Sequence, residues 1–252
     1  MKVSIITATY NSSKLLKRTL NSVQNQDYDN IEHIIIDGGS TDGTIEILNN
    51  HKQQISILIS EKDSGIYDAL NKGLKLATGD IIGFLNSDDY FASIHSVSSV
   101  VNAFKTENAD VVYGDLLYQA DVDAKVKTIR YWKSNPFNPN SLKFGWMPPH
   151  PTVYCKREVY ETYGHFNSTM NISADYDFIL RIFKLPNITK TYIPKVIVNM
   201  QIGGTSNDSI KNLFVKTKED YMAARANNCG GFTSVFFKNI RKIKQFFSKY
   251  NP

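Results

Sequence analysis

The run Asn86-Ser87-Asp88-Asp89 places two adjacent carboxylates directly after the apolar stretch Ile81–Leu85. This pattern is typical of a buried strand that carries acid groups to the edge of an α/β sheet, where ligands bind. Because Asp is seldom buried unless it is paired or coordinates a metal, the pair indicates a hard cation held by oxygen ligands. An isolated Asp-Asp pair more often forms a turn that caps a helix, here one beginning near Ser93. The surrounding sequence decides between these interpretations.

Polar loops also follow the other apolar runs of the first hundred residues. They are Thr7–Asn11, Asp37–Thr44 and Glu61–Gly65. In a doubly wound sheet such loops converge on one crevice, where Asp37 can accept hydrogen bonds from a base or ribose and Tyr10 can stack on a base. Each loop alone is equally well explained as a tight turn followed by a capped helix.

Alternating strand and helix patterns position these loops. The β-branched runs predict strands at residues 2–7, 31–36, 55–60, 80–85 and 110–114. Apolar residues at helical spacing predict helices over 14–24, 44–50, 66–77 and 97–105. Continuous Ile and Val runs separated by helices predict a parallel sheet that is covered on both faces. After Gly114 the pattern loosens into aromatic, proline-rich segments typical of a lobe with antiparallel strands, followed by a helix at 174–183, a strand at 191–200 and a helix at 210–226.

Composition limits the class of protein. With 252 residues, of which 42% are apolar, the chain can bury a full core, so global disorder is excluded. Two cysteines, Cys155 and Cys229, form neither a disulfide framework nor a metal-ligand spacing. The net charge of +5 comes from the end of the chain, because residues 1–220 hold 23 basic and 24 acidic groups. A neutral body argues against a nucleic-acid partner. No signal peptide or membrane-spanning run is recognised, and we expect a cytoplasmic protein.

Four segments together resemble the family 2 glycosyltransferases with the GT-A fold. They are Val3–Asn11, Ile35–Thr44, Asp63–Gly73 and Asn86–Asp89. The resemblance is strong over residues 2–90 and thinner to about residue 205. It implies a Rossmann-like, doubly wound, mostly parallel α/β sheet with a smaller antiparallel acceptor lobe and C-terminal helices. It divides the chain into a nucleotide-sugar-binding half (1–114), an acceptor and catalytic half of the same domain (115–206) and C-terminal helices (207–252).

The resemblance also implies a site that binds a nucleotide sugar and a divalent cation, Mn²⁺ or Mg²⁺. The metal motif of the family, Asp-x-Asp, falls on Asn86-Ser87-Asp88, where the first acid is an amide. Asn86 removes one negative charge and leaves Asp88 as the better ligand. The metal ligands implied are Asp88, Asp89 and His150, and the donor-binding residues implied are Thr7, Tyr10, Asn11, Asp37, Asp63, Asn71, Asn86, Asp88 and His150.

The segment Ile172–Arg181 is similar to the one in which this family places its catalytic base. Inverting displacement needs a carboxylate to take the proton of the acceptor hydroxyl, and the resemblance implies Asp175 for this role. Asp177 lies on a different helix face and is expected to be structural. On sequence alone, both acids are as well explained by the positive N-terminus of the helix. Gln201–Ser206 resembles a loop that closes over the site and excludes water.

The tail Val235–Tyr250 predicts a basic amphipathic helix with Phe236, Ile240, Ile243 and Phe247 on one stripe and most of its basic residues off that stripe. We interpret it as a helix that lies on an anionic membrane surface. The alternative is a helix that packs its apolar stripe on the protein body.

We therefore expect a metal-dependent, inverting hexosyltransferase. It would move a sugar from a UDP-linked donor to a polyprenyl-diphosphate-linked saccharide on the inner face of the cell membrane. The setting expected is bacterial surface polysaccharide synthesis, such as O-antigen, capsule or exopolysaccharide. One alternative is a nucleotidyltransferase, which is disfavoured because no Gly-rich phosphate loop with a downstream Lys is found near the N-terminus. The other is a non-catalytic module that binds nucleotide sugars or membrane surfaces, which Asn86 keeps open.

Overall fold

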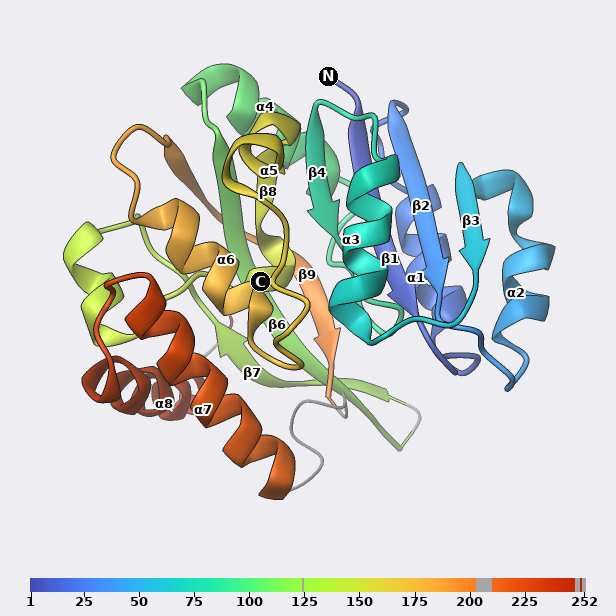
Figure 1. Ribbon diagram of the computed structural model, residues 1–252. Helices are drawn as coiled ribbons and strands as arrows, with labels where there is room; N and C mark the ends of the chain where they lie inside the picture. Colours follow the sequence, from blue (N-terminus) through green and yellow to red (C-terminus); the bar gives the residue numbers. More distant parts are fainter. Residues whose placement is uncertain (124, 203–209, 248–249, 251–252) are drawn as a thin grey trace.

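One mixed sheet runs through the whole protein (Figure 1). The computed structural model describes residues 1–123, 125–202, 210–247 and 250, and nine strands lie in this part of the chain. The order is β3-β2-β1-β4-β8-β6-β9-β5, and β7 pairs with β6 outside this path. The strands are β1 Val3–Thr9, β2 Ile31–Asp37, β3 Ile57–Ser60, β4 Ile81–Phe84, β5 Tyr90–Phe91, β6 Val111–Val122, β7 Lys125–Trp132, β8 Tyr154–Lys156 and β9 Lys190–Gln201.

Helices cover both faces of this sheet (Figure 1). Helices α3, α5 and α6 pack on one face, and α4 packs on the other with α1 and α2 beside it. Helices α7 and α8 lie next to α6 at the end of the molecule far from β3. The helices are α1 Leu16–Gln24, α2 Thr44–Asn50, α3 Ile66–Leu76, α4 Ser96–Glu107, α5 Arg157–Tyr163, α6 Ala174–Phe183, α7 Ile210–Ala226 and α8 Phe232–Phe247.

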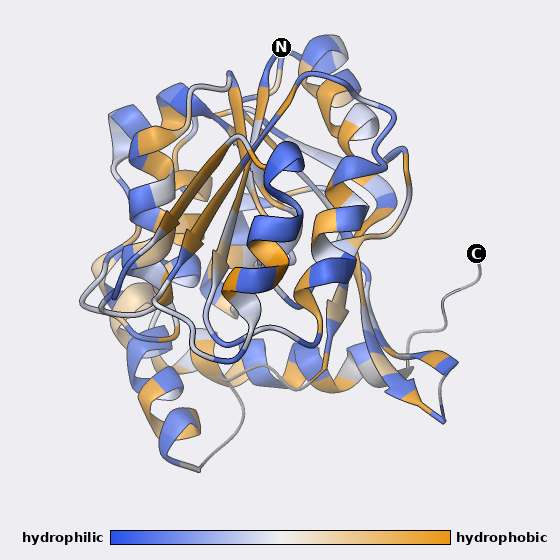
Figure 2. Ribbon diagram, turned by 90° about the vertical axis from the view of Figure 1, so that its right-hand side faces the viewer, coloured by the Kyte–Doolittle hydropathy of each residue, from blue (hydrophilic) through white to orange (hydrophobic). Residues whose placement is uncertain are grey.

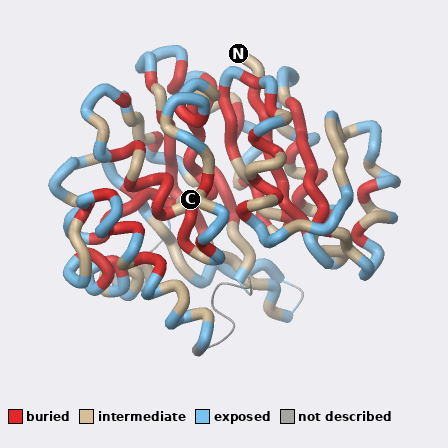
Figure 3. The backbone as a smooth tube through the Cα atoms, in the orientation of Figure 1, coloured by how far each residue is buried: buried red, intermediate tan, exposed pale blue. Residues whose placement is uncertain are grey.

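The two-sided cover explains the apolar runs of the sequence. In β1, Ile6 and Ala8 belong to the core under α3, whereas Val3 and Ile5 belong to the core under α4. Every residue of β1 is buried, so alternation of polar and apolar residues is lost. Figure 3 shows the buried backbone concentrated in the central strands, and Figure 2 shows those strands mostly hydrophobic while the helices alternate.

The structure confirms the predicted α/β class and places most elements of the first half within a few residues of the prediction. Apart from the short strand β5, which the sequence does not predict, the differences lie after Gly114. Strand β6 continues to Val122, pairs antiparallel with β7 and parallel with β9, so the antiparallel strands extend the main sheet. The boundary predicted at residue 114 falls inside β6. Strands β7 and β8 and helix α5 are absent from the prediction. In the described residues, no helix is long and apolar enough to cross a membrane.

Candidate active site

Asp37 ends β2 and organises the loop that follows it. Its buried carboxylate accepts hydrogen bonds from the backbone N–H groups of Gly39 and Ser40, both at 3.0 Å, and from the Ser60 hydroxyl at 2.7 Å. The Ser40 hydroxyl donates to the other carboxylate oxygen. Asp37 is expected from the sequence to accept hydrogen bonds from a base or ribose, but both of its carboxylate oxygens already accept hydrogen bonds from the protein. Asp37 holds the shape of the loop that would face the nucleoside.

The loop after β1 is tied to the loop after β2 through Asn11. This residue has a left-handed backbone, with φ of 48°, and its side-chain oxygen accepts from the N–H of Thr41 at 2.9 Å. Tyr10 beside it is 64% exposed, so its ring is open to a ligand. Thr7 lies further back, where its fully buried hydroxyl pairs with Nε2 of His33 at 3.0 Å. The Thr7 hydroxyl thus makes an internal hydrogen bond, and its contact with the donor stays a prediction.

Asp63 lies against the same edge of the sheet, next to Gly38. A Cβ atom on Gly38 would come within 2.6 Å of the Asp63 carboxylate, so the glycine lets this carboxylate lie close to the backbone. Asn71, in α3, lies differently, because its amide donates to the carbonyl of Phe166 at 2.9 Å and accepts from its N–H at 3.1 Å. Asn71 thus connects the two halves of the chain.

The loop after β4 contains the predicted metal motif. Asp89 is fully buried, and its oxygens accept from Nδ2 of Asn86 at 3.0 Å and from the backbone N–H of Gln201 at 3.1 Å. Burial and the neighbouring Asp88 raise the pKa of Asp89 well above its usual range. Burial also raises the pKa of Asp88. In the described residues, no three His, Cys, Asp or Glu side chains are grouped to hold a metal, so the protein offers chiefly Asp88.

Asp89 also marks the start of the predicted closing loop. Gln201, the last residue of β9, donates its N–H to Asp89 and accepts from the Arg18 guanidinium through its side-chain oxygen at 2.7 Å. Residues 203–206 of the predicted loop lie outside the described residues. The segment that precedes them is anchored to the acid beside Asp88.

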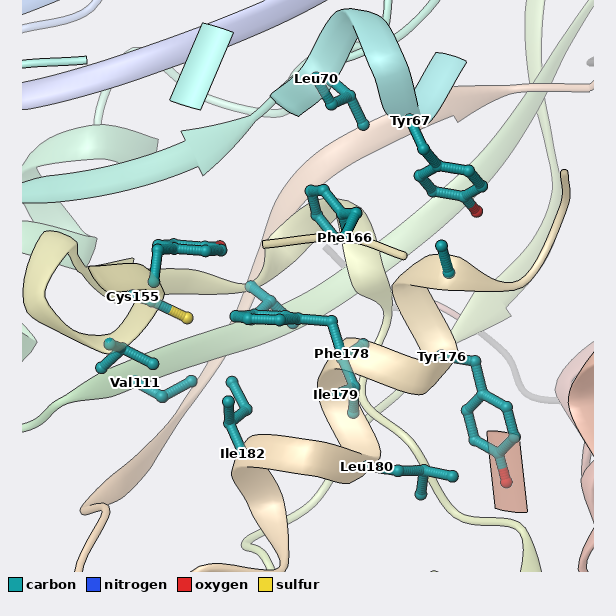
Figure 4. Close-up of a cluster of buried hydrophobic side chains, with 14 of the residues drawn as sticks. Tyr67, Leu70, Val111, Cys155, Phe166, Tyr176, Phe178, Ile179, Leu180 and Ile182 are labelled. Carbon is teal, nitrogen blue, oxygen red and sulfur yellow. The ribbon is translucent and has the colours of Figure 1, made fainter. Parts of the chain in front are cut away.

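Asp175 lies in the first turn of α6, as predicted, and two side chains from distant segments contact it. The Tyr67 hydroxyl lies 3.1 Å from its Oδ1, and Nδ1 of His150 lies 3.1 Å from its Oδ2. The same hydroxyl donates to the carbonyl of Ile172 at 2.7 Å. Figure 4 shows Tyr67 beside the start of α6, with Tyr176 pointing away from it. The Asp175 side chain keeps 19% of its surface exposed.

Partial burial lowers the pKa of His150, although Asp175 opposes the shift. The imidazole is therefore neutral at pH 7, and because a carboxylate only accepts, the proton lies on Nδ1. This leaves Nε2 with a free lone pair.

The loop before Asp175 is fixed from α7. The buried Glu219 carboxylate accepts the backbone N–H groups of Asn171, Ile172 and Ser173, at 2.8, 2.8 and 2.9 Å. Asp177, by contrast, is buried and accepts from Arg181 and from Asn227. Asp177 is structural, in agreement with the sequence analysis.

The metal motif and Asp175 share a neighbour in Tyr118 of β6. Burial raises the pKa of Tyr118; Arg130 lowers it, and Asp89 and Asp175 both raise it further. The two carboxylates therefore act on one phenol from different sides. This brings the predicted metal motif and the predicted base to one region.

Two positioning residues are missing from the sequence analysis. Tyr67 falls within the quoted segment Asp63–Gly73, one turn from Asp63, so its place in that motif is a usable signal. Glu219 is an acid in an ordinary helical pattern, and no local signal distinguishes it.

Comparison with known proteins agrees with this architecture. Residues 4–169 match Glycosyl transferase family 2, and the chain belongs to that family. The PGL/p-HBAD biosynthesis glycosyltransferase of Mycobacterium bovis is 31% identical over 219 residues, covering 84% of this chain and 82% of the relative. The chain is therefore a family 2 glycosyltransferase.

Solved structures show the GT-A fold. S. aureus TarS 1-349 in complex with UDP-GlcNAc superposes with a TM-score of 0.69 at 19% identity, covering 90% of this chain and 65% of that one. The mannosyltransferase PcManGT from Pyrobaculum calidifontis, in complex with GDP-Man and Mn²⁺, gives a TM-score of 0.65 at 19% identity and covers 97% and 69%.

Proposed function

We propose that this glycosyltransferase moves one sugar, with inversion, from a UDP-linked donor to a lipid-linked saccharide in bacterial surface polysaccharide synthesis. The observation that carries the proposal is the partly exposed Asp175, which Tyr67 and His150 contact on its two oxygens. The solved complex of TarS with UDP-GlcNAc and the relative named for PGL/p-HBAD biosynthesis support the donor and the setting.

Asp175 would act as the general base. The acceptor oxygen forms a bond to the anomeric carbon, the bond from that carbon to the diphosphate breaks, and the acceptor proton moves to Asp175. The diphosphate leaves with the nucleoside as UDP. The two contacts and the loop bound by Glu219 would fix the carboxylate, so little orientation is lost at the moment of reaction.

A divalent cation fits the donor set if the substrate supplies most of its ligands. Mg²⁺ and Mn²⁺ sites that bind nucleotides often use one or two carboxylates, with phosphate oxygens and water completing the shell. Asp88 would provide the direct carboxylate, and Nε2 of His150 is a further candidate. Asp89 would act indirectly, because its hydrogen bonds fix Asn86 and the backbone of Gln201 beside Asp88. The cation would neutralise the leaving diphosphate. It would also stabilise the ionised form of Asp88, whose pKa burial raises.

The nucleoside would bind where the loops after β1, β2 and β3 meet. Tyr10 offers an exposed ring for stacking on the base, and Asp63 and Asn11 lie at the same edge. Asp37 would support the site by shaping its loop. Asn71 would act indirectly by fixing the loop at Phe166.

The acceptor would be presented at a membrane surface. Large apolar side chains are exposed on α7 and α8, including Phe214 at 74%, Phe232 at 80% and Phe236 at 61%. Helix α8 packs on the body, although not through the apolar stripe that the packed-helix alternative expects. Val235 and Lys238 point inward, and Phe236 and Ile243 point outward. The side chain of Phe247 lies outside the described residues. These outward apolar side chains on α7 and α8 favour contact with lipid.

Incubation with a panel of UDP- and GDP-linked sugars tests the transfer reaction. Release of nucleoside diphosphate should require Mn²⁺ or Mg²⁺ and should rise with a polyprenyl-diphosphate saccharide acceptor. Retention of every donor unchanged, with no thermal stabilisation by any nucleotide, would contradict the proposal. For the membrane contact, the double substitution Phe214→Ser and Phe236→Ser should reduce flotation with anionic vesicles. The matched control is Ile94→Ser, because Ile94 is 53% exposed and lies outside α7 and α8.

A further inference from the structure

A small basic cavity of about 190 Å³ lies between α8, the end of β7 and the turn at Gly145. Lys238, Arg241 and Lys242 line it from α8, and Lys133 lines it from the chain after β7. A Cβ atom on Gly145 would come within 2.1 Å of the Ser234 carbonyl, so glycine allows α8 to approach this closely. The sequence analysis expects the basic residues of this helix to face a membrane. The structure instead turns Lys238 and Lys242 inward.

The cavity has more positive than negative charge. The buried Asp220 carboxylate binds Lys238 at 2.7 Å through one oxygen and Lys216 of α7 at 3.0 Å through the other. Lys242 is the third ammonium group of the cluster, and burial, followed by Lys216 and Lys238, lowers its pKa to about 7. Two lysines therefore bind one carboxylate, and Lys242 adds a third positive group beside them.

A purely structural role explains only part of this cluster. The ion pair between Lys238 and Asp220 is sufficient to fasten α8 to α7. Lys242 is half-buried, and a third ammonium group beside Lys216 and Lys238 is a cost to the folded state, because cations withdrawn from water are unfavourable unless paired. An anion that enters the cavity would balance the charge. The excess of positive charge therefore indicates a binding site for an anion and not a stabilising role.

The cavity and the first turn of α6 are linked through Lys238, whose ammonium group lies 3.4 Å from the centre of the Tyr176 ring, beside Asp175 in the sequence. Lys216, Lys238 and Lys242 all lower the pKa of His150, and Asp175 contributes to the pKa of Lys216 and Lys238. Every residue that lines the cavity lies between Trp132 and Gln245, so none comes from the loops after β1, β2 or β4. A ligand here would approach Asp175 from the acceptor side.

We propose that Lys242, together with Lys216, Lys238 and Arg241, binds a phosphate or diphosphate group of the acceptor. This inference rests on the proposed function and gives its lipid-linked acceptor a place in the structure. Ammonium and guanidinium groups form charge-assisted hydrogen bonds to phosphate oxygens, which suits them to this ligand class. The reacting saccharide would then extend from the phosphate toward Asp175.

The test uses the full chain in EDTA, because without a divalent cation neither the donor site nor a bound metal takes up the probe. Calorimetry measures binding of inorganic pyrophosphate and of geranyl diphosphate. Lys242→Gln should weaken both at least about tenfold, as expected when a charged hydrogen-bond donor is lost. Lys242 is preferred to Lys238 because its removal leaves no buried carboxylate unpaired. The matched control is Lys218→Gln, an exposed lysine on α7, which should bind as the unmodified chain does.

Steady-state kinetics then separates the two possible phosphate sources. The KM for the lipid-linked acceptor should rise at least about tenfold in Lys242→Gln, with the KM for the donor changed less than about twofold. A rise confined to the donor KM would assign the lysines to the donor diphosphate and overturn the inference. Equal pyrophosphate binding by Lys242→Gln and the unmodified chain would also overturn it, even if transfer is intact. If no transfer is found with any donor, the proposed function fails, whereas pyrophosphate binding still reports on the cavity.

Discussion

The nucleoside side and the acceptor side of this enzyme are built in different ways. On the nucleoside side several contacts are local, such as Asp37 with Ser40 and Asn86 with Asp89, each three residues apart, and Asn11 with Thr41 joins two of the loops whose motifs the sequence displays. On the acceptor side, Asp175 depends on Tyr67 and His150, and its loop depends on Glu219. Local contacts leave a compact sequence motif. Long-range contacts leave isolated residues whose meaning appears only after folding.

Loss of the acid at the metal motif should have the largest effect. We expect Asp88→Ala to reduce transfer to background and to abolish cation-dependent donor binding, because Asp89 is already engaged by Asn86 and Gln201. Activity assays and calorimetry with UDP, each with and without Mn²⁺, provide the measurement. The control Asn86→Asp should stay active and should bind the cation more tightly. Near-normal turnover by Asp88→Ala would show that the metal assignment is wrong.

Replacement of the predicted base tests the acceptor side. Asp175→Asn should lower kcat about 100-fold or more, with folding and donor affinity preserved, since a general base typically contributes this much. Asp177→Asn should mainly lower the melting temperature, because Asp177 is buried between Arg181 and Asn227. If turnover required Asp177 and tolerated Asp175→Asn, the base would move by two positions.

A smaller effect is expected from the residues that position Asp175. Tyr67→Phe removes one hydrogen bond to the carboxylate and should lower kcat about tenfold, with little change in the donor KM. Tyr163→Phe is a control, because its hydroxyl accepts a hydrogen bond from Asn187, whereas Tyr67 and His150 are the residues that contact the Asp175 carboxylate. A Tyr67→Phe effect on melting temperature alone would make Tyr67 merely structural.

The pH dependence of anion binding should show the smallest effect. Lys242, with a pKa of about 7, faces Lys216 and Asp220 of α7, Lys238 and Arg241 of α8 and Lys133. Below pH 7 it is charged before an anion arrives, whereas above pH 7 binding requires proton uptake. Pyrophosphate affinity should therefore fall about fivefold from pH 7 to pH 8. The same titration of Lys242→Gln corrects for ionisation of the probe, and an identical slope in both proteins would contradict the expectation.

The difference between the two sides also decides what the sequence can predict. The strands that end at Asp37 and Phe84 are continuous apolar runs, so the parallel half of the fold and its loops are readable. Asp175 is found through a segment resemblance, but its partners are not, because Tyr67 and Glu219 lie 108 and 44 residues away in the chain.

Helix α8 shows a second reason why the sequence does not predict every contact. Its helical spacing is correct, but which face packs is decided by Asp220, a buried partner that periodicity cannot reveal. An apolar stripe is a good guide to the inward face only when no buried ion pair competes. In α8 the ion pair determines the orientation, and the stripe is left outside.

If the proposed acceptor site is correct, two neighbouring acids of α7 would let the enzyme discriminate between acceptors. Glu219 fixes the loop that precedes Asp175, and Asp220 binds the lysines of the basic cavity. A ligand that draws Lys216 and Lys238 toward itself would act, through Asp220, on the same turn of α7 from which Glu219 sets the position of Asp175. Acceptor analogues without the phosphate would then react slowly even at saturation, and the enzyme would select its acceptor by rate as well as by affinity.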